Sequence, residues 1–204
     1  DNEFKTLDKI IGAMLQTKPA TGLESSVAKA RAAGEAFDPA RIRLFETLAA
    51  ALKQTPLRES PEAITNPEPL RVLAFFEAYF SNYIEGTQFE VEEAREIVFE
   101  EKIPEARPED AHDVLGTYHV VSNLPEYQKL PTDFESFWAL VSTRHESILA
   151  ARPGTHPGEI KLKPNRAGDT HFVAPDLVRG TLAKGFEFYK VLDFPSARAA
   201  FMMF

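Results

Sequence analysis

Apolar residues recur three and four positions apart along most of this chain, which is the spacing that gives an α-helix one apolar face. The spacing is clear over residues 5–16 and 39–53, where Ile42, Phe45 and Leu48 follow one another. Hydrophobic residues make up 44% of the 204 residues, enough for one sizeable core or for one core and a smaller lobe. A mostly α fold is therefore predicted.

Prolines divide this helical pattern into segments. Residues 54–69, QTPLRESPEAITNPEP, carry four prolines and predict a connector. We therefore expect a helical N-terminal region at 1–60 and a second region at 61–204. The helices expected in the second region cover 68–85, 88–102, 109–123, 132–151 and 176–191, with a last helix from 196.

Two of these helices show a capping signature, in which a Thr side chain caps the first turn and a Glu three residues later bonds back. The pairs are Thr87 with Glu90 and Thr132 with Glu135. In the helix at 68–85 the large apolar side chains are expected to be buried. They are Leu70, Leu73, Phe76, Phe80 and Ile84.

The period changes around residues 159–173. Ile160 and Leu162 alternate with Lys161 and Lys163, as in an edge strand, and the β-prone THFV follows after the turn-forming PNRAGD. A small β-hairpin is predicted here, in an otherwise helical protein.

Composition limits the function classes. The net charge is −8 at pH 7, so nucleic acid is not expected as the main partner, because contacts to phosphates depend on Lys and Arg. The absence of cysteine excludes disulfides, thiolate metal sites and a Cys nucleophile, and it fits a reducing compartment such as the cytoplasm. There is no signal peptide, and no apolar run reaches the length of a membrane span.

The stretch SNYIEGTQFE, residues 81–90, raises a question about charge. Gly86 is expected to close the preceding helix in the left-handed conformation. Glu85 then lies in the last helical turn, where the helix dipole disfavours an anion by roughly 0.3–1 kcal/mol. Ser81 lies one turn earlier on the same face, which continues through small residues. Glu85 is either a solvated side chain that tolerates this cost or one partner of a nearby cation.

Residues 77–87, EAYFSNYIEGT, resemble the inhibitory helix of Fic-domain proteins, whose pattern is Ser or Thr, three residues, Glu, then Gly or Asn. Ser81, Glu85 and Gly86 match this pattern position by position. The later segments also follow the order of the family: further helices, a β-hairpin called the flap, a helix opened by Pro, and a Pro-containing turn before another helix. The resemblance covers roughly residues 68–204.

The resemblance implies a Fic-like helical bundle and an AMP transferase. Fic proteins use ATP and Mg²⁺ to move AMP onto a hydroxyl of a target protein. In the self-inhibited members the helix Glu, here Glu85, pairs with an Arg of the catalytic motif and fills the space of the ATP γ-phosphate. The flap, here residues 160–163, would hold the target protein by strand addition. A surface hairpin whose lysines prevent aggregation is the other interpretation of these residues.

The catalytic motif of the family, His-Pro-Phe followed by Gly-Asn-Gly and an Arg, does not occur in these 204 residues. No catalytic residue or metal ligand is therefore predicted within them, and the chain alone is expected to be inactive. Because it ends in the apolar helical pattern SARAAFMMF, we expect it to be part of a longer protein, with the motif shortly after Phe204. A non-enzymatic helical interaction module, or a Fic-like protein with a degenerate motif, are the alternatives. The target, the modified residue and a homo-oligomeric state stay open.

Overall fold

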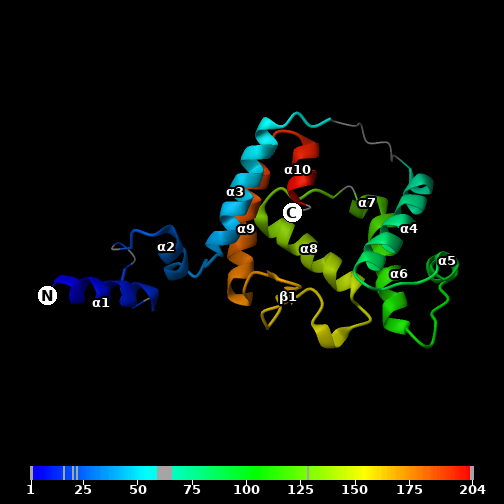
Figure 1. The fold of residues 1–204 in the computed structure, drawn as a ribbon, viewed down its shortest axis with the longest axis horizontal. Coiled ribbons are helices and arrows are strands. Elements are labelled where there is room, and N and C mark those ends of the chain that lie inside the picture. Colours follow the sequence, from blue (N-terminus) through cyan, green and yellow to red (C-terminus); the bar gives the residue numbers. More distant parts are fainter. Residues whose placement is uncertain are drawn as a thin grey trace. The chain divides into compact units, whose positions relative to one another are not determined.

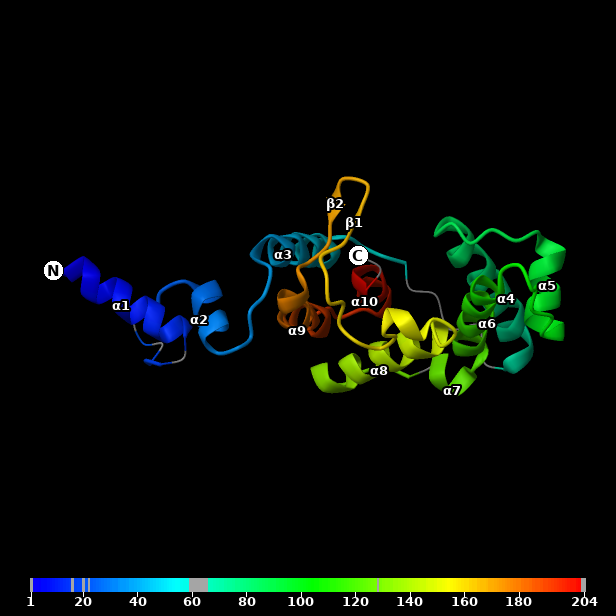
Figure 2. The same cartoon turned by 90° about the horizontal axis from the view of Figure 1, so that it is seen from below.

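The fold of this chain is mostly helical, as predicted (Figures 1 and 2). The structure is a computed structural model, and it describes residues 2–15, 17–19, 21, 23–58, 66–127 and 129–202. The chain divides into two compact units. The terminal unit comprises residues 1–60 and 160–204, and the central unit comprises residues 61–159. One boundary between the units lies at residue 60, and residues 160–204 group with the N-terminal region.

The terminal unit is built from helical segments. They are α1 (Asn2–Met14), α2 (Ser26–Ala32), α3 (Pro39–Gln54), η3 (Pro175–Leu177), α9 (Val178–Lys190) and α10 (Pro195–Met202). The start of α3 follows from its sequence. Asp38 caps the helix by accepting hydrogen bonds from the backbone N–H groups of Ala40 and Arg41, and Pro39 occupies the first position, where no N–H is needed.

Close packing of α9 against the start of α3 holds the terminal unit together. A side chain at Gly180 would place its Cβ 2.2 Å from the carbonyl oxygen of Ala36, so only glycine permits this approach. The backbone N–H of Asp38 donates to Thr181 Oγ1 over 2.9 Å. From α10, the ring of Phe201 lies 5.6 Å from that of Phe45. Contacts of α3 with α9 and α10 thus link residues far apart in sequence.

A short hairpin belongs to the same unit and stands out beyond α3 in Figure 2. Its strands, β1 (Arg166–Ala167) and β2 (Thr170–His171), pair antiparallel around a two-residue turn in which Gly168 has φ +55°. The strand expected at Ile160–Lys163 is wrong, because these four residues lie outside both strands. The two-residue turn at Gly168 sets the register, which pairs Ala167 with Thr170 and Arg166 with His171.

The central unit is a layered group of helices with α6 in the middle. Its elements are α4 (Pro67–Ile84), α5 (Val91–Glu100), α6 (Pro108–Ser122), α7 (Leu124–Tyr127), α8 (Phe134–Ile148) and η2 (Pro153–Thr155). Helix α6 contacts α4, α5 and α8. Its Gly116 leaves room for α8, since a Cβ there would lie 2.8 Å from the carbonyl oxygen of Ile148. The described part of the chain contains no helix long and apolar enough to cross a bilayer.

Both predicted capping pairs are wrong. Helix α5 begins at Val91 after Glu90, not after Thr87, because Phe89 is buried in the core and keeps the preceding residues extended. The carbonyl of Phe89 accepts a hydrogen bond from the hydroxyl of Tyr79 over 3.2 Å. Helix α8 has a capping box formed by Asp133 and Ser136, one residue beyond the predicted pair Thr132 and Glu135. Asp is the stronger cap of the two neighbours.

The buried face of α4 also differs from the expected one. Leu70 is fully buried, but the other four large residues are exposed: Leu73 by 38%, Phe76 by 47%, Phe80 by 56% and Ile84 by 81%. The buried side of α4 instead includes the small residues Ala74 and Ala78, both fully buried, together with Leu70 and Phe75. Helix α6 therefore packs against α4 where the side chains of α4 are short.

Candidate functional site

The C-terminal end of α4 is fixed by a Schellman motif. The N–H of Gly86 donates to the carbonyl of Tyr83 over 3.1 Å, and the N–H of Thr87 donates to that of Asn82 over 3.0 Å. Gly86 has φ +103°, which confirms that it closes the helix in a conformation that favours glycine. The motif sets the position of Glu85, the last residue before the turn.

Glu85 is exposed and sits at the electronegative end of α4. Among the residues that the structure describes, no ion pair of its carboxylate is recorded. Ser81, one turn earlier and half-buried, donates its hydroxyl to the carbonyl of Glu77 over 2.7 Å. The two predicted side chains thus share one face of α4 without bonding to each other, and the carboxylate stays open to an incoming cation.

Asn82 is a buried polar residue beside these two that the sequence analysis missed. Its Nδ2 donates to the carbonyl of Ala78 over 2.9 Å and to Thr117 Oγ1 of α6 over 3.3 Å. The Thr117 hydroxyl in turn donates to the carbonyl of Asp113 over 2.9 Å. The end of α4 is therefore tied to α6 by polar contacts as well as by packing. The sequence does contain a signal for this contact: Asn82 lies four positions after Ala78, so it is a polar residue on the small-residue face of α4.

A second polar cluster joins the segment after α8 to the start of α6. The guanidinium of Arg152 contacts three carboxylates: Glu109 at 2.9 Å, Asp110 at 2.6 Å and Asp113 at 2.8 Å. Burial raises the pKa of Asp113 above its ordinary value, and this outweighs the opposing effect of Arg152. Oδ1 of Asp113 is buried without a hydrogen-bond partner among the described residues. The cluster is structural, since its carboxylates are already engaged by one cation.

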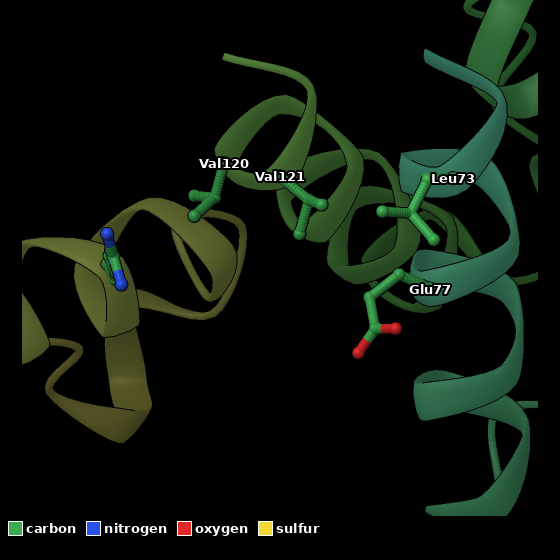
Figure 3. Close-up of a pocket in the computed structure, with 5 residues that line it drawn as sticks. Leu73, Glu77, Val120 and Val121 are labelled. Atoms are coloured by element: carbon green, nitrogen blue, oxygen red, sulfur yellow. The ribbon is translucent and has the colours of Figure 1, made fainter. Parts of the chain in front are cut away.

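A pocket of about 400 Å³ opens between α4, α6 and α8 (Figure 3). It is lined by Leu73, Glu77, Val120, Val121 and Arg144. Figure 3 shows both valines and Leu73 directed into the space, with the carboxylate of Glu77 at its edge. Nε of Arg144 is 3.1 Å from Oε1 of Glu126, and its Nη2 donates to the carbonyl of the same residue over 2.7 Å. The pocket therefore combines an apolar wall with one carboxylate, Glu77, and one guanidinium, Arg144, that is held by Glu126.

The predicted flap residues lie in the terminal unit, whereas Ser81, Glu85 and Gly86 lie in the central unit. Leu162 is 75% exposed and Lys163 is exposed, while Ile160 and Lys161 are half-buried. The ammonium group of Lys161 contacts Asn165 and lies 5.6 Å from the centre of the Phe172 ring. Residues 160–163 therefore precede the hairpin as an irregular arm, rather than forming its edge.

The described residues contain no group of three or more His, Asp or Glu side chains that could hold a metal ion. Mg²⁺ and the ATP phosphates were expected at the catalytic motif, which is not in this sequence. Comparison of the chain with protein-family models, curated proteins and solved structures finds no match. The candidate site is thus defined by the end of α4 alone.

Proposed function

We propose that this chain is the N-terminal part of a self-inhibited Fic-type AMP transferase of the cytoplasm, and that Glu85 is its inhibitory acid. The observation that carries the proposal is the exposed carboxylate of Glu85, held by a Schellman motif at the negative end of α4 with no recorded ion pair among the described residues. A rigid, unfavourably placed anion is what one half of an inhibitory ion pair requires.

The resemblance to Fic proteins implies the chemistry. An Arg that would otherwise bind the ATP γ-phosphate in a bidentate contact is instead held by Glu85. ATP with Mg²⁺ then binds without the orientation that transfer to a hydroxyl needs. Ser81 and Gly86 act on the position of the helix end and not on the phosphate. The segment around Ile160–Lys163 and the hairpin after it would hold the target protein through backbone contacts.

Removing the carboxylate tests the proposal. In the natural full-length protein, Glu85→Gly is expected to raise self-labelling by labelled ATP and Mg²⁺, because the Arg is released to orient the γ-phosphate. The gain could reach about a hundredfold, the rate lost through a misplacement of about 1 Å. Ser81→Ala should change labelling much less. Labelling is measured at matched concentrations of folded protein.

Two further variants separate inhibition from stability. Glu85→Gln removes the charge and keeps the side chain, so it should also raise labelling. Glu77→Gln makes the same change two turns earlier on α4 and should not. If Glu85→Gly and Glu85→Gln both fold and label no better than the wild type, Glu85 is not an inhibitory acid.

A second candidate function is a non-enzymatic helical interaction module, and the exposed apolar side of α4 favours it. Four large residues there are exposed: Leu73, Phe76, Phe80 and Ile84. A full-length protein with a degenerate motif would also fail to label. The interaction module would be supported if the wild type and the Glu85 variants were all inactive and the protein still bound a partner through α4.

A further inference from the structure

The side of α4 opposite Ala74 and Ala78 is apolar over four turns and exposed, and Leu73 lies at its edge beside the pocket. This outer face comprises Val72, Leu73, Phe76, Phe80, Tyr83 and Ile84, which are between 38% and 81% exposed. The opposite side of α4 is packed on α6, so this helix has a second apolar face that the described residues leave uncovered. Connected exposed apolar surface of this kind marks an interaction site.

Ring contacts make the outer face continuous and hold it in place. The rings of Phe76 and Phe80 stack with centroids 6.1 Å apart. Tyr79 lies 5.2 Å from Phe80 and 5.9 Å from Tyr83. Phe75, from the core, lies 5.4 Å from Phe76. Aromatic side chains fixed in this way lose little conformational freedom on binding, so contacts to them contribute most of their energy to affinity.

Charge narrows the choice of partner. The outer face carries no charged residue, like the centre of a protein–protein interface. Glu68 and Glu77 lie beside it, and they disfavour the phosphates of nucleic acid and of anionic lipid. The chain as a whole has a charge of −8. A second copy of the chain can approach through the outer face, because no like charges meet there.

The spacing of the outer face fits a second copy running in the opposite direction. Leu73, Phe76, Phe80 and Tyr83 are three, four and three residues apart, as along the seam of a two-helix coiled coil. These positions are symmetric about Ala78. A two-fold axis at the level of Ala78 therefore sets Phe76 against Phe80 of the second copy, and Leu73 against Tyr83. Antiparallel helix dipoles also favour this arrangement.

We propose that the outer face of α4 is the interface of a homodimer, in which two α4 helices pack antiparallel about this axis. Val72 and Ile84 flank the seam. With about 150–250 Å² available per aromatic side chain, burying both outer faces removes on the order of 1,000–1,200 Å², the lower end of specific interfaces. A micromolar dissociation constant is expected. The inference is independent of AMP transfer and concerns these 204 residues alone.

Sedimentation equilibrium across the micromolar range tests the dimer. The wild type should show a monomer–dimer equilibrium, and Phe80→Glu should raise the dissociation constant at least about tenfold, because a charge enters the centre of the seam. Phe80→Lys should act alike, which separates lost apolar contact from added negative charge. Phe80 is 56% exposed, so both variants should keep the melting temperature of the monomer. Leu130→Glu, at a 75% exposed site outside the face, should leave the equilibrium unchanged.

Disulfide trapping tests the antiparallel register, and a chain without cysteine gives no background. Positions 73 and 83 lie about 15 Å apart along one helix, too far for a bridge within it. The double variant Leu73→Cys with Tyr83→Cys should therefore form a bridged dimer on oxidation, while each single variant should not.

Three outcomes overturn the proposal. A wild type that stays monomeric throughout the micromolar range shows that the outer face serves another purpose, such as covering by another part of the same chain. A dimer that Phe80→Glu and Phe80→Lys leave intact places the interface elsewhere. Bridging by Leu73→Cys alone, as fast as by the double variant, shows a parallel or non-specific contact.

Discussion

The two faces of α4 are both apolar but differ in the size of their side chains. The inner face presents Ala74 and Ala78, both fully buried against α6, while the outer face presents Phe76 and Phe80, both about half exposed. Hydrophobicity alone would bury the aromatic face. The structure buries the small one, because two helix backbones approach closely only where the side chains between them are short. The small side chains of Ala74 and Ala78 therefore mark where α6 approaches this helix, while the larger Leu70 and Phe75 are buried beside them.

Two substitutions on α4, one on each face, test this difference between the faces. Their expected effect on stability is the largest of the effects predicted here. Ala78→Leu adds a branched side chain where no space exists, so it should lower the free energy of unfolding by about 1–3 kcal/mol. Phe80→Ala removes a larger group from the outer face and should cost less than about 1 kcal/mol. Both are measured by urea unfolding at low protein concentration, so that self-association does not contribute. Equal costs would show that the two faces are not distinct in the monomer.

The sequence predicts where the helices of this protein lie in the chain better than it predicts which helices pack together. The starts of α3, α4 and α6 are close to the predicted ones, because Pro39, Pro67 and Pro108 each fix a first helical position. Two short helices, α2 and α7, were missed, since neither is long enough to show a clear period. The residues buried on α4 could not be predicted, because they depend on α6, which comes later in the chain and packs there.

The candidate site shows the same division between local and distant effects. The Gly86 turn was predictable, because a left-handed helix end is a property of a few adjacent residues. The position of the hairpin was not, although the alternation of Ile160–Lys163 suggested a strand. The two-residue turn at Gly168 places the strands a few residues later. The polar contacts of Asn82 with Thr117 join residues 35 positions apart and leave only a weak trace in the sequence.

A substitution at Gly86, which closes the C-terminal end of α4, should have a smaller effect on stability. Gly86→Val should lower the free energy of unfolding by about 1 kcal/mol or more, since φ +103° strains a residue with a branched Cβ. No atom lies within 4 Å of a Cβ built there, so the cost is one of backbone conformation and not of collision. Gly86→Asn should cost less, because Asn tolerates positive φ. Thermal unfolding compares the three proteins, and an unchanged melting temperature for Gly86→Val would contradict the cap.

The smallest expected effect is the pH dependence of stability that comes from Asp113, next to the inner face of α4. The inner face continues through Asn82 and Thr117 to the buried Asp113, whereas the outer face has no titratable acid. Burial raises the pKa of the Asp113 carboxyl above its ordinary value of 3.8. At a pH between 3.8 and the raised pKa, the folded protein therefore binds a proton at Asp113 that the unfolded chain does not bind. The free energy of unfolding, relative to Asp113→Asn, should therefore increase as the pH falls through this window and be constant above it.

A substitution of Arg152 tests the cause of this pH dependence. Its guanidinium opposes the effect of burial by favouring the charged form of Asp113, alongside its contacts to Glu109 and Asp110. Arg152→Met should thus raise the pKa of Asp113 further and move the start of the pH dependence to higher pH. Urea unfolding at a series of pH values, with Arg152→Met introduced both into the wild type and into the Asp113→Asn variant, isolates the contribution of this one carboxyl. A wild type that loses stability on acidification, relative to Asp113→Asn, would mean that the ion pair with Arg152 outweighs burial and that the inner face contains a stabilising charge.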